Sequence, residues 1–119
     1  MLIVDDDEGD GELAARRLAP LGAAIDFHLG PEGASDKIRD GGYDVVVLDV
    51  NMPGISGLQI LGALKDHKSD ARVMLYSAMD PSGLAEIAKT AGVAHLNKSA
   101  SRKELVRAVG ELLGGDARA

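Results

Sequence analysis

Residues 45–57 read VVVLDVNMPGISG, four apolar residues followed by an aspartate and then a loop that contains proline and glycine. A short, wholly apolar run of this kind is typical of a parallel strand that is covered on both faces. Asp49 comes directly after the run, where open α/β sheets bind their ligands. The stretch therefore predicts a buried strand over Val45–Leu48 with a carboxylate at its carboxyl end.

Four more apolar runs lie at fairly even intervals around this strand, at Leu2–Val4, Ala23–His28, Arg72–Tyr76 and Val93–Leu96. Segments with apolar residues at helical spacing separate them, and the weakest of these is 31–39, which glycines disfavour. The alternation predicts an α/β fold, a doubly wound five-stranded parallel sheet with five helices and right-handed crossovers.

Two of the expected helices carry clear end signals. Asp80 and Pro81 form an N-cap and a first-turn proline, and Gly92 follows the end of that helix. Ser101 and Glu104 have the spacing of a capping box before the last helix. These signals predict where the fourth and fifth helices begin.

The chain has 119 residues, a formal net charge of −6, 45% apolar residues and no cysteine. We expect one domain over residues 1–119, with 113–119 as a frayed tail. The lack of cysteine excludes thiolate metal sites, and the acidic balance argues against nucleic-acid binding by this domain. No apolar run approaches the roughly 18 residues of a membrane span, and no secretion signal is visible. We therefore expect a cytoplasmic domain without membrane contact.

Polar side chains follow the predicted strands at the edge of the sheet where ligands bind. Aspartates at 5–7 follow the first strand, Asp49 the third, Ser77 the fourth and Lys98 the fifth. Each alone has an ordinary explanation, such as a helix cap, a turn or a solvated side chain. Their common position at one edge favours a joint role.

These residue types together suit the chemistry of phosphoryl groups. Carboxylates that lie close together repel, so they favour a hard divalent cation such as Mg²⁺ bound through oxygen. A carboxylate beside Mg²⁺ can attack phosphorus and form an aspartyl phosphate. A lysine and a hydroxyl can neutralise the phosphoryl oxygens.

The chain resembles the receiver domain of two-component response regulators in four segments, LIVDDD, VVVLDVNMPGISG, MLYSA and HLNKS, at residues 2–7, 45–57, 74–78 and 95–99. The resemblance covers nearly the whole chain. It implies a flavodoxin-like sheet with strand order 2-1-3-4-5, which would bring the first and third strands side by side.

The resemblance also implies the metal ligands and the phosphoacceptor. In that family an acidic pair after the first strand holds Mg²⁺, which corresponds here to Asp5 and Asp6. The phosphorylated aspartate corresponds to Asp49, which is also a metal ligand. The ligand two residues later, a backbone carbonyl, corresponds to Asn51.

Three further positions complete the implied site. Lys98 corresponds to the lysine that pairs with the phosphoryl group, and Ser77 to the hydroxyl residue after the fourth strand. His95 stands at the position of the family's aromatic switch residue. In the family the hydroxyl moves toward the phosphoryl group and the aromatic ring turns inward.

The chain departs from the family pattern at three positions. Ser99 follows Lys98 where the family has proline with a cis peptide, so we predict a trans Lys98–Ser99 peptide because a non-proline cis bond costs about 2.5–4 kcal/mol. His95 replaces the family's tyrosine or phenylalanine. Asp7 adds a third acid, which we interpret as a solvated carboxylate at the start of a helix.

The resemblance predicts that Asp49 takes a phosphoryl group from a histidine kinase or a histidine phosphotransfer protein and that Ser77 and His95 signal its presence. Such a domain is a switch with self-directed phosphotransfer and slow autodephosphorylation, not an enzyme for an external substrate. Whether phosphorylation produces a homodimer stays open.

Two other functions remain alternatives. A degenerate receiver would act only as a protein-binding module, which the complete set of acids, hydroxyl and lysine disfavours. A Mg²⁺-dependent phosphohydrolase also uses an aspartyl nucleophile, but that class places it after the first strand and carries a larger cap. A nucleotide-binding module is weaker still, because no GxxxxGK[ST] or GxGxxG loop occurs.

Overall fold

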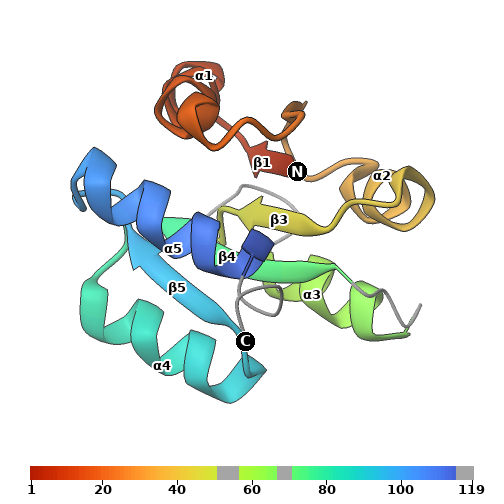
Figure 1. Ribbon diagram of the computed structural model, residues 1–119. Coiled ribbons are helices and arrows are strands. Elements are labelled where there is room, and N and C mark those ends of the chain that lie inside the picture. Colours follow the sequence, from red (N-terminus) through yellow and green to blue (C-terminus); the bar gives the residue numbers. More distant parts are fainter. Residues whose placement is uncertain (51–56, 67–70, 115–119) are drawn as a thin grey trace.

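The computed structural model describes residues 1–50, 57–66 and 71–114, and strands and helices alternate through them (Figure 1). The strands are β1 (Leu2–Asp5), β2 (Asp26–Leu29), β3 (Val45–Leu48), β4 (Arg72–Ser77) and β5 (Ala94–Asn97). The helices are α1 (Glu8–Leu18), α2 (Ala34–Gly41), α3 (Gly57–Asp66), α4 (Pro81–Ala91) and α5 (Arg102–Gly114), with a 3-10 turn η1 (Ala19–Leu21) after α1.

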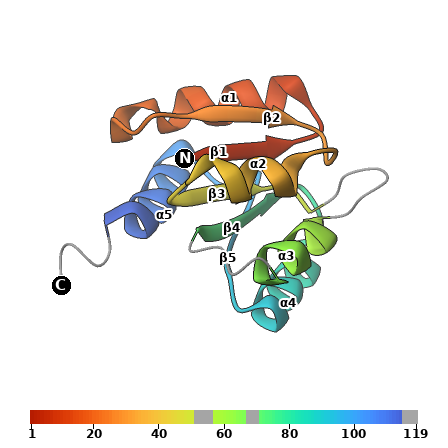
Figure 2. The ribbon, with the colours of Figure 1, turned by 90° about the vertical axis from the view of Figure 1, so that its right-hand side faces the viewer.

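The five strands form one parallel sheet in the order β2-β1-β3-β4-β5, which Figure 2 shows from the side. Alternate side chains of each strand point to opposite faces, so the sheet has two apolar cores. Val46 and Leu48 pack with α2, α3 and α4, whereas Val45 and Val47 pack with α1 and α5. Figure 1 shows these helices around the sheet. This is the doubly wound fold that the alternation predicted, with the strand order that the resemblance implied.

Strands β1 and β3 are buried at every position, as their apolar runs predict, and β4 is buried from Met74 to Ser77. The outer strands β2 and β5 are partly exposed, because each has only one neighbouring strand. The predicted second strand was wrong at its start: β2 begins at Asp26, not Ala23. Its pairing with β1 starts at the Leu2–Asp26 register, so residues 23–25 have no β1 residue opposite them.

The predicted helix starts of α4 and α5 are confirmed. The Asp80 carboxylate accepts a hydrogen bond from the Gly83 backbone N–H at 3.0 Å, and Gly92 ends α4 with a left-handed φ of 72°. At α5 the Glu104 N–H donates to Ser101 Oγ at 3.2 Å. The predicted tail overlaps the end of α5, which extends to Gly114, and residues 115–119 lie outside the described part of the chain.

The weakly predicted second helix also forms, as α2. It is bounded by Gly33 and Gly42, whose φ values of 76° and 64° are left-handed. Glycine adopts such values at no steric cost, so both residues end the helix and do not weaken its interior. No helix within the described ranges is long and apolar enough to cross a membrane.

Candidate functional site

The sheet brings two aspartates together at the carboxyl ends of neighbouring strands. Asp5 is the last residue of β1, and Asp49 directly follows β3. The Val4–Leu48 register and a 3.0 Å hydrogen bond from the Asp49 N–H to the Val4 carbonyl place the two aspartates side by side. Their side chains are only 4% and 6% exposed, so this edge of the sheet holds two buried carboxyl groups.

Asp6 completes an acidic cluster with these two residues. One carboxylate oxygen from each of Asp5, Asp6 and Asp49 lies within 4.8 Å of the others, and Asp6 is exposed. Carboxylate oxygens are the ligands that Mg²⁺ prefers, and Mg²⁺ keeps several waters when it binds. The donor set therefore fits a hydrated divalent cation. Asn51, the other predicted ligand, lies outside the described residues.

Lys98 lies against the same cluster, just after β5. Its Nζ donates to Asp5 Oδ2 at 2.8 Å and to Asp49 Oδ2 at 3.2 Å, and its side chain is only 14% exposed. The structure thus joins three of the predicted site residues by direct contacts, although Asp5 and Lys98 are 93 positions apart in the sequence.

The surroundings raise the pKa values of both Asp5 and Lys98. Burial raises the pKa of Asp5, and the hydrogen bonds from Lys98 and from the Asp7 N–H offset this only in part. For Lys98, burial alone would lower the pKa, but hydrogen bonds to Asp5 and Asp10 and the charge of Asp49 together raise it. Lys98 is therefore charged at neutral pH, whereas the ionised form of Asp5 is disfavoured by its surroundings.

Asp7 is the N-cap of α1, in agreement with its interpretation as a helix-start carboxylate. Its Oδ1 accepts from the Asp10 N–H at 3.0 Å, and its own N–H donates to Asp5 Oδ1 at 3.0 Å.

Asp10, which the sequence analysis missed, is the third acceptor of Lys98, with an Nζ–Oδ2 distance of 2.9 Å. An acid in a first helical turn has an ordinary explanation in the helix dipole, so only the structure reveals this contact.

Ser77 is the last residue of β4 and is fully buried. Its carbonyl accepts from the Lys98 N–H at 2.9 Å, and its Oγ accepts from the Met79 N–H at 3.4 Å. The end of β4 that carries the Ser77 hydroxyl is therefore hydrogen-bonded to Lys98.

Among the described residues no peptide bond is cis, so the predicted trans Lys98–Ser99 peptide is confirmed.

Asn97 is a second residue that the sequence analysis missed. Its Nδ2 donates to the Met79 carbonyl at 2.8 Å, and its Oδ1 accepts from the Ser99 N–H at 2.9 Å. The side chain thus joins the loop after β4 to the loop after β5. A proline at position 99 could not donate this hydrogen bond, so the contact depends on a departure from the family pattern.

Replacing Asn97 should separate these two loops. Asn97→Ala removes the donor to the partly buried Met79 carbonyl and the acceptor of the exposed Ser99 N–H, and we expect the free energy of unfolding to fall by about 1–2 kcal/mol. Asn97→Asp keeps the acceptor for Ser99 but places a carboxylate oxygen against the Met79 carbonyl, so it should lose at least as much stability. Urea unfolding of both variants measures this, and an Asn97→Ala midpoint equal to the wild type would contradict it.

His95, the predicted switch residue, is the second residue of β5 and is exposed. It pairs in register with Leu75 of β4, whereas Ser77 pairs with Asn97. His95 and Ser77 are therefore on neighbouring strands, with the imidazole outside the core in this structure.

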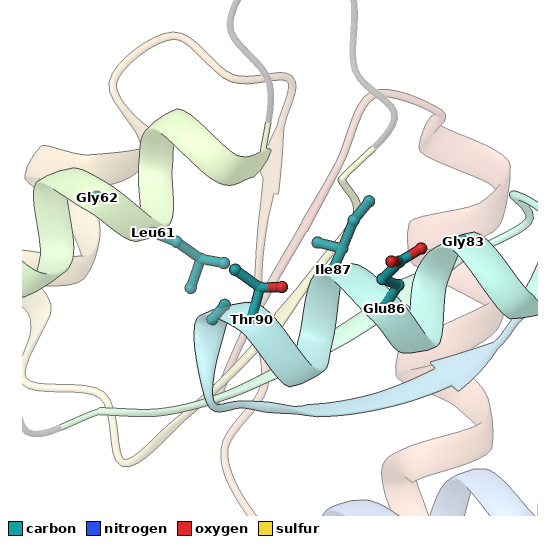
Figure 3. A pocket seen from close by; sticks show the side chains of 7 residues that line it. Leu61, Gly62, Gly83, Glu86, Ile87 and Thr90 are labelled. Carbon is teal, nitrogen blue, oxygen red and sulfur yellow. The ribbon is translucent and has the colours of Figure 1, made fainter.

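A separate apolar groove of about 630 Å³ lies between α3 and α4 (Figure 3). Leu61 of α3 points toward α4, where Ile87 and Thr90 also line the groove. The groove and the acidic cluster share no lining residue among those described. The groove is thus distinct from the predicted site.

Comparison with known families gives one match over most of the chain. The model of the response regulator receiver domain matches residues 1–110. The uncharacterized transcriptional regulatory protein YkoG of Bacillus subtilis is 38% identical over 81 residues, 67% of this chain and 35% of YkoG. PcoR of Escherichia coli, a transcriptional regulatory protein, is 32% identical over 81 residues, 67% of this chain and 35% of PcoR. The chain spans about a third of the length of these relatives.

Solved structures are similar over nearly the whole chain. The signal receiver domain of NarL from Mycobacterium tuberculosis is 31% identical with a TM-score of 0.76, covering 91% of this chain and 90% of that one. The response regulator TrrA from Thermotoga maritima, solved in complex with Mg²⁺–BeF, is 35% identical with a TM-score of 0.82, covering 93% of this chain and 96% of that one.

Proposed function

Because the chain belongs to the response regulator receiver domains, we propose that it takes a phosphoryl group from a phosphohistidine onto Asp49 in the presence of Mg²⁺. One observation carries the proposal: Lys98 Nζ lies between the buried carboxylates of Asp5 and Asp49, at 2.8 and 3.2 Å. A cation held beside a buried carboxylate is what an incoming phosphoryl group requires. The test is incubation with a small phosphodonor, followed by intact mass measurement with and without Mg²⁺.

In the proposed transfer a carboxylate oxygen of Asp49 attacks phosphorus in line with the P–N bond of the phosphohistidine. The new P–O bond forms as the P–N bond breaks. The electron pair of that bond stays on the imidazole nitrogen, which takes a proton from solvent. Lys98, already 3.2 Å from Asp49 Oδ2, then pairs with a phosphoryl oxygen.

We propose Asp5, Asp6 and Asp49 as the carboxylate ligands of Mg²⁺, with the backbone carbonyl of Asn51 as a further ligand. The compact carboxylate group of the first three supports this assignment. When bound, Mg²⁺ neutralises charge on the phosphoryl oxygens and on the carboxylates. The similar response regulator TrrA, solved in complex with Mg²⁺–BeF, supports binding of Mg²⁺ by this chain but does not identify the ligands.

We propose Ser77 and His95 as the parts of the switch. Ser77 is buried at the end of β4 beside Lys98, and the exposed His95 ring suits the unphosphorylated state. A phosphoryl group on Asp49 would draw the Ser77 hydroxyl toward it and let the His95 ring turn inward. The alternative is that His95 stays at the surface in both states. A ring that remains exposed in the beryllofluoride complex would contradict the proposed movement.

The proposed donor of the phosphoryl group is a histidine kinase or a histidine phosphotransfer protein in the cytoplasm. The phosphorylated domain would then signal to a downstream partner. The matched segment is only 35% of the length of YkoG and of PcoR, so the output is not assigned from this chain. A degenerate receiver, the alternative function, has no need for a buried lysine shared between two carboxylates, because protein binding does not use that charge.

The aspartyl phosphate should be long-lived because of Met79, two residues after Ser77. Its partly buried thioether cannot orient an attacking water as an amide or a carboxylate can. Met79→Gln should therefore raise the dephosphorylation rate by about tenfold or more, which loss of the phosphorylated mass over time would measure. Met79→Leu, the matched apolar control, should keep the wild-type rate. Equal rates in Met79→Gln and the wild type would overturn this explanation.

A further inference from the structure

The Lys98 ammonium group donates to three carboxylates, which differ in burial and in whether they belong to the acidic cluster. An ammonium group has three N–H bonds, which here match Asp5, Asp10 and Asp49 at 2.8, 2.9 and 3.2 Å. Asp5 and Asp49 are buried and belong to the acidic cluster, whereas the Asp10 side chain is 49% exposed and lies outside it. Asp10 is therefore a partner of Lys98 that a cation in the cluster would not occupy.

Asp10 is also held firmly in place. The Asp7 N–H donates to Asp5 Oδ1, the Asp10 N–H donates to Asp7 Oδ1, and Lys98 Nζ donates to both Asp10 Oδ2 and Asp5 Oδ2. These four hydrogen bonds form a closed ring through the start of α1. The backbone of Asp10 thus has a fixed position relative to the site, and its half-exposed carboxylate joins that site through Lys98.

A divalent cation in the acidic cluster would compete with Lys98 for two of its three partners. It would bind carboxylates that now accept from Nζ and would repel the ammonium, because both carry positive charge. A flexible lysine without another anchor would then swing toward solvent. The contact with Asp10 is the one of the three that such a cation would not compete for, since Asp10 is not in the cluster.

We propose that Asp10 is a positioning residue, which keeps the Lys98 ammonium at the phosphorylation site when Mg²⁺ enters the acidic cluster. This inference rests on the proposed function, because the position matters only if Asp49 receives a phosphoryl group. Transfer depends on the placement of charge around the phosphoryl oxygens, so loss of the anchor should slow it.

The first test compares Asp10→Asn with Glu8→Gln. Glu8 lies in the same first turn of α1, is exposed and carries the same charge, and no contact between it and Lys98 is found in the described part of the chain. With a small phosphodonor and saturating Mg²⁺, Asp10→Asn should label Asp49 about tenfold more slowly. Glu8→Gln should stay within about twofold of the wild type, because it removes only distant charge. In a Lys98→Gln background, Asp10→Asn should have no further effect.

The second test does not depend on phosphorylation. In the Mg²⁺-saturated protein, NMR of the lysine ammonium groups should give a slowly exchanging signal that Lys98→Gln removes. Asp10→Asn should lose this signal and Glu8→Gln should keep it. A signal that persists in Asp10→Asn, or labelling of Asp10→Asn as fast as the wild type or faster, would overturn the inference. A wild-type chain that takes no phosphoryl group would instead contradict the proposed function.

Discussion

Asp49→Asn should abolish the uptake of a phosphoryl group, seen as the loss of a roughly 80 Da adduct in the intact mass after incubation with a small phosphodonor and Mg²⁺. Asparagine has nearly the shape of aspartate but lacks the anionic oxygen that attacks phosphorus. Asp49 is the carboxylate that follows β3, lies beside Asp5 and contacts Lys98. The expected effect is therefore complete loss.

Asp7→Asn is the matched control for this experiment. Asp7 is exposed and caps α1, and asparagine caps helices about as well as aspartate. The Asp7→Asn variant should therefore keep the adduct. Continued labelling of Asp49→Asn would refute the assignment of the acceptor. A wild-type chain without any adduct would favour the degenerate receiver, and continuous consumption of the phosphodonor would favour a phosphohydrolase.

Mg²⁺ should stabilise the fold by about 2.7 kcal/mol at a concentration one hundred times its Kd, by mass action on the folded state. The physical reason is the buried pair of carboxylates. Burial raises the pKa of Asp5, so at neutral pH the ionised group is held in surroundings that disfavour it. A cation between Asp5 and Asp49 relieves this cost. Urea unfolding with and without Mg²⁺, at matched ionic strength, measures the difference.

Asp6 offers a clean variant for this measurement, because it is exposed and its replacement leaves the core intact. Asp6→Asn should lose most of the Mg²⁺ stabilisation, and Asp7→Asn should retain it. An unfolding midpoint that does not respond to Mg²⁺ in the wild type would contradict the metal site.

The pH dependence of the folding stability follows from the direction in which the pKa of Asp5 is shifted. A carboxyl whose folded pKa is raised contributes stability below its ordinary pKa, and this contribution is lost as the pH rises through the folded value. In the metal-free protein the contribution of Asp5 therefore falls as the pH rises. Protons compete with the cation for the same oxygens, so stabilisation by Mg²⁺ should be larger at pH 7 than in acid.

The sequence predicted the fold because its signals are local and agree with one another. Val45–Leu48 is apolar at every position and proves to be buried on both faces. Asp80 and Ser101 start helices through contacts with residues only three positions away. The start of β2 was misplaced because an apolar stretch does not reveal where its partner strand begins.

The candidate site could be predicted only in part, for a related reason. Asp5, Asp49 and Lys98 are found from their positions after strands, because strand ends of a parallel sheet meet at one edge. Asp10 and Asn97 act through the direction of their side chains across gaps of 88 and 18 positions. No periodicity or cap signal encodes such directions, so these contacts had to come from the structure.

The position of Lys98 directly after β5 affects how firmly this edge strand is attached to the rest of the fold. β5 has a single strand neighbour, β4, and its residues are exposed or half-buried, so it has the features of a segment that opens locally before the rest of the fold. The ion pairs of Lys98 join the residue after this strand to Asp5 of β1 and Asp10 of α1. A change of charge in the acidic cluster would therefore also change how readily this edge strand detaches from β4.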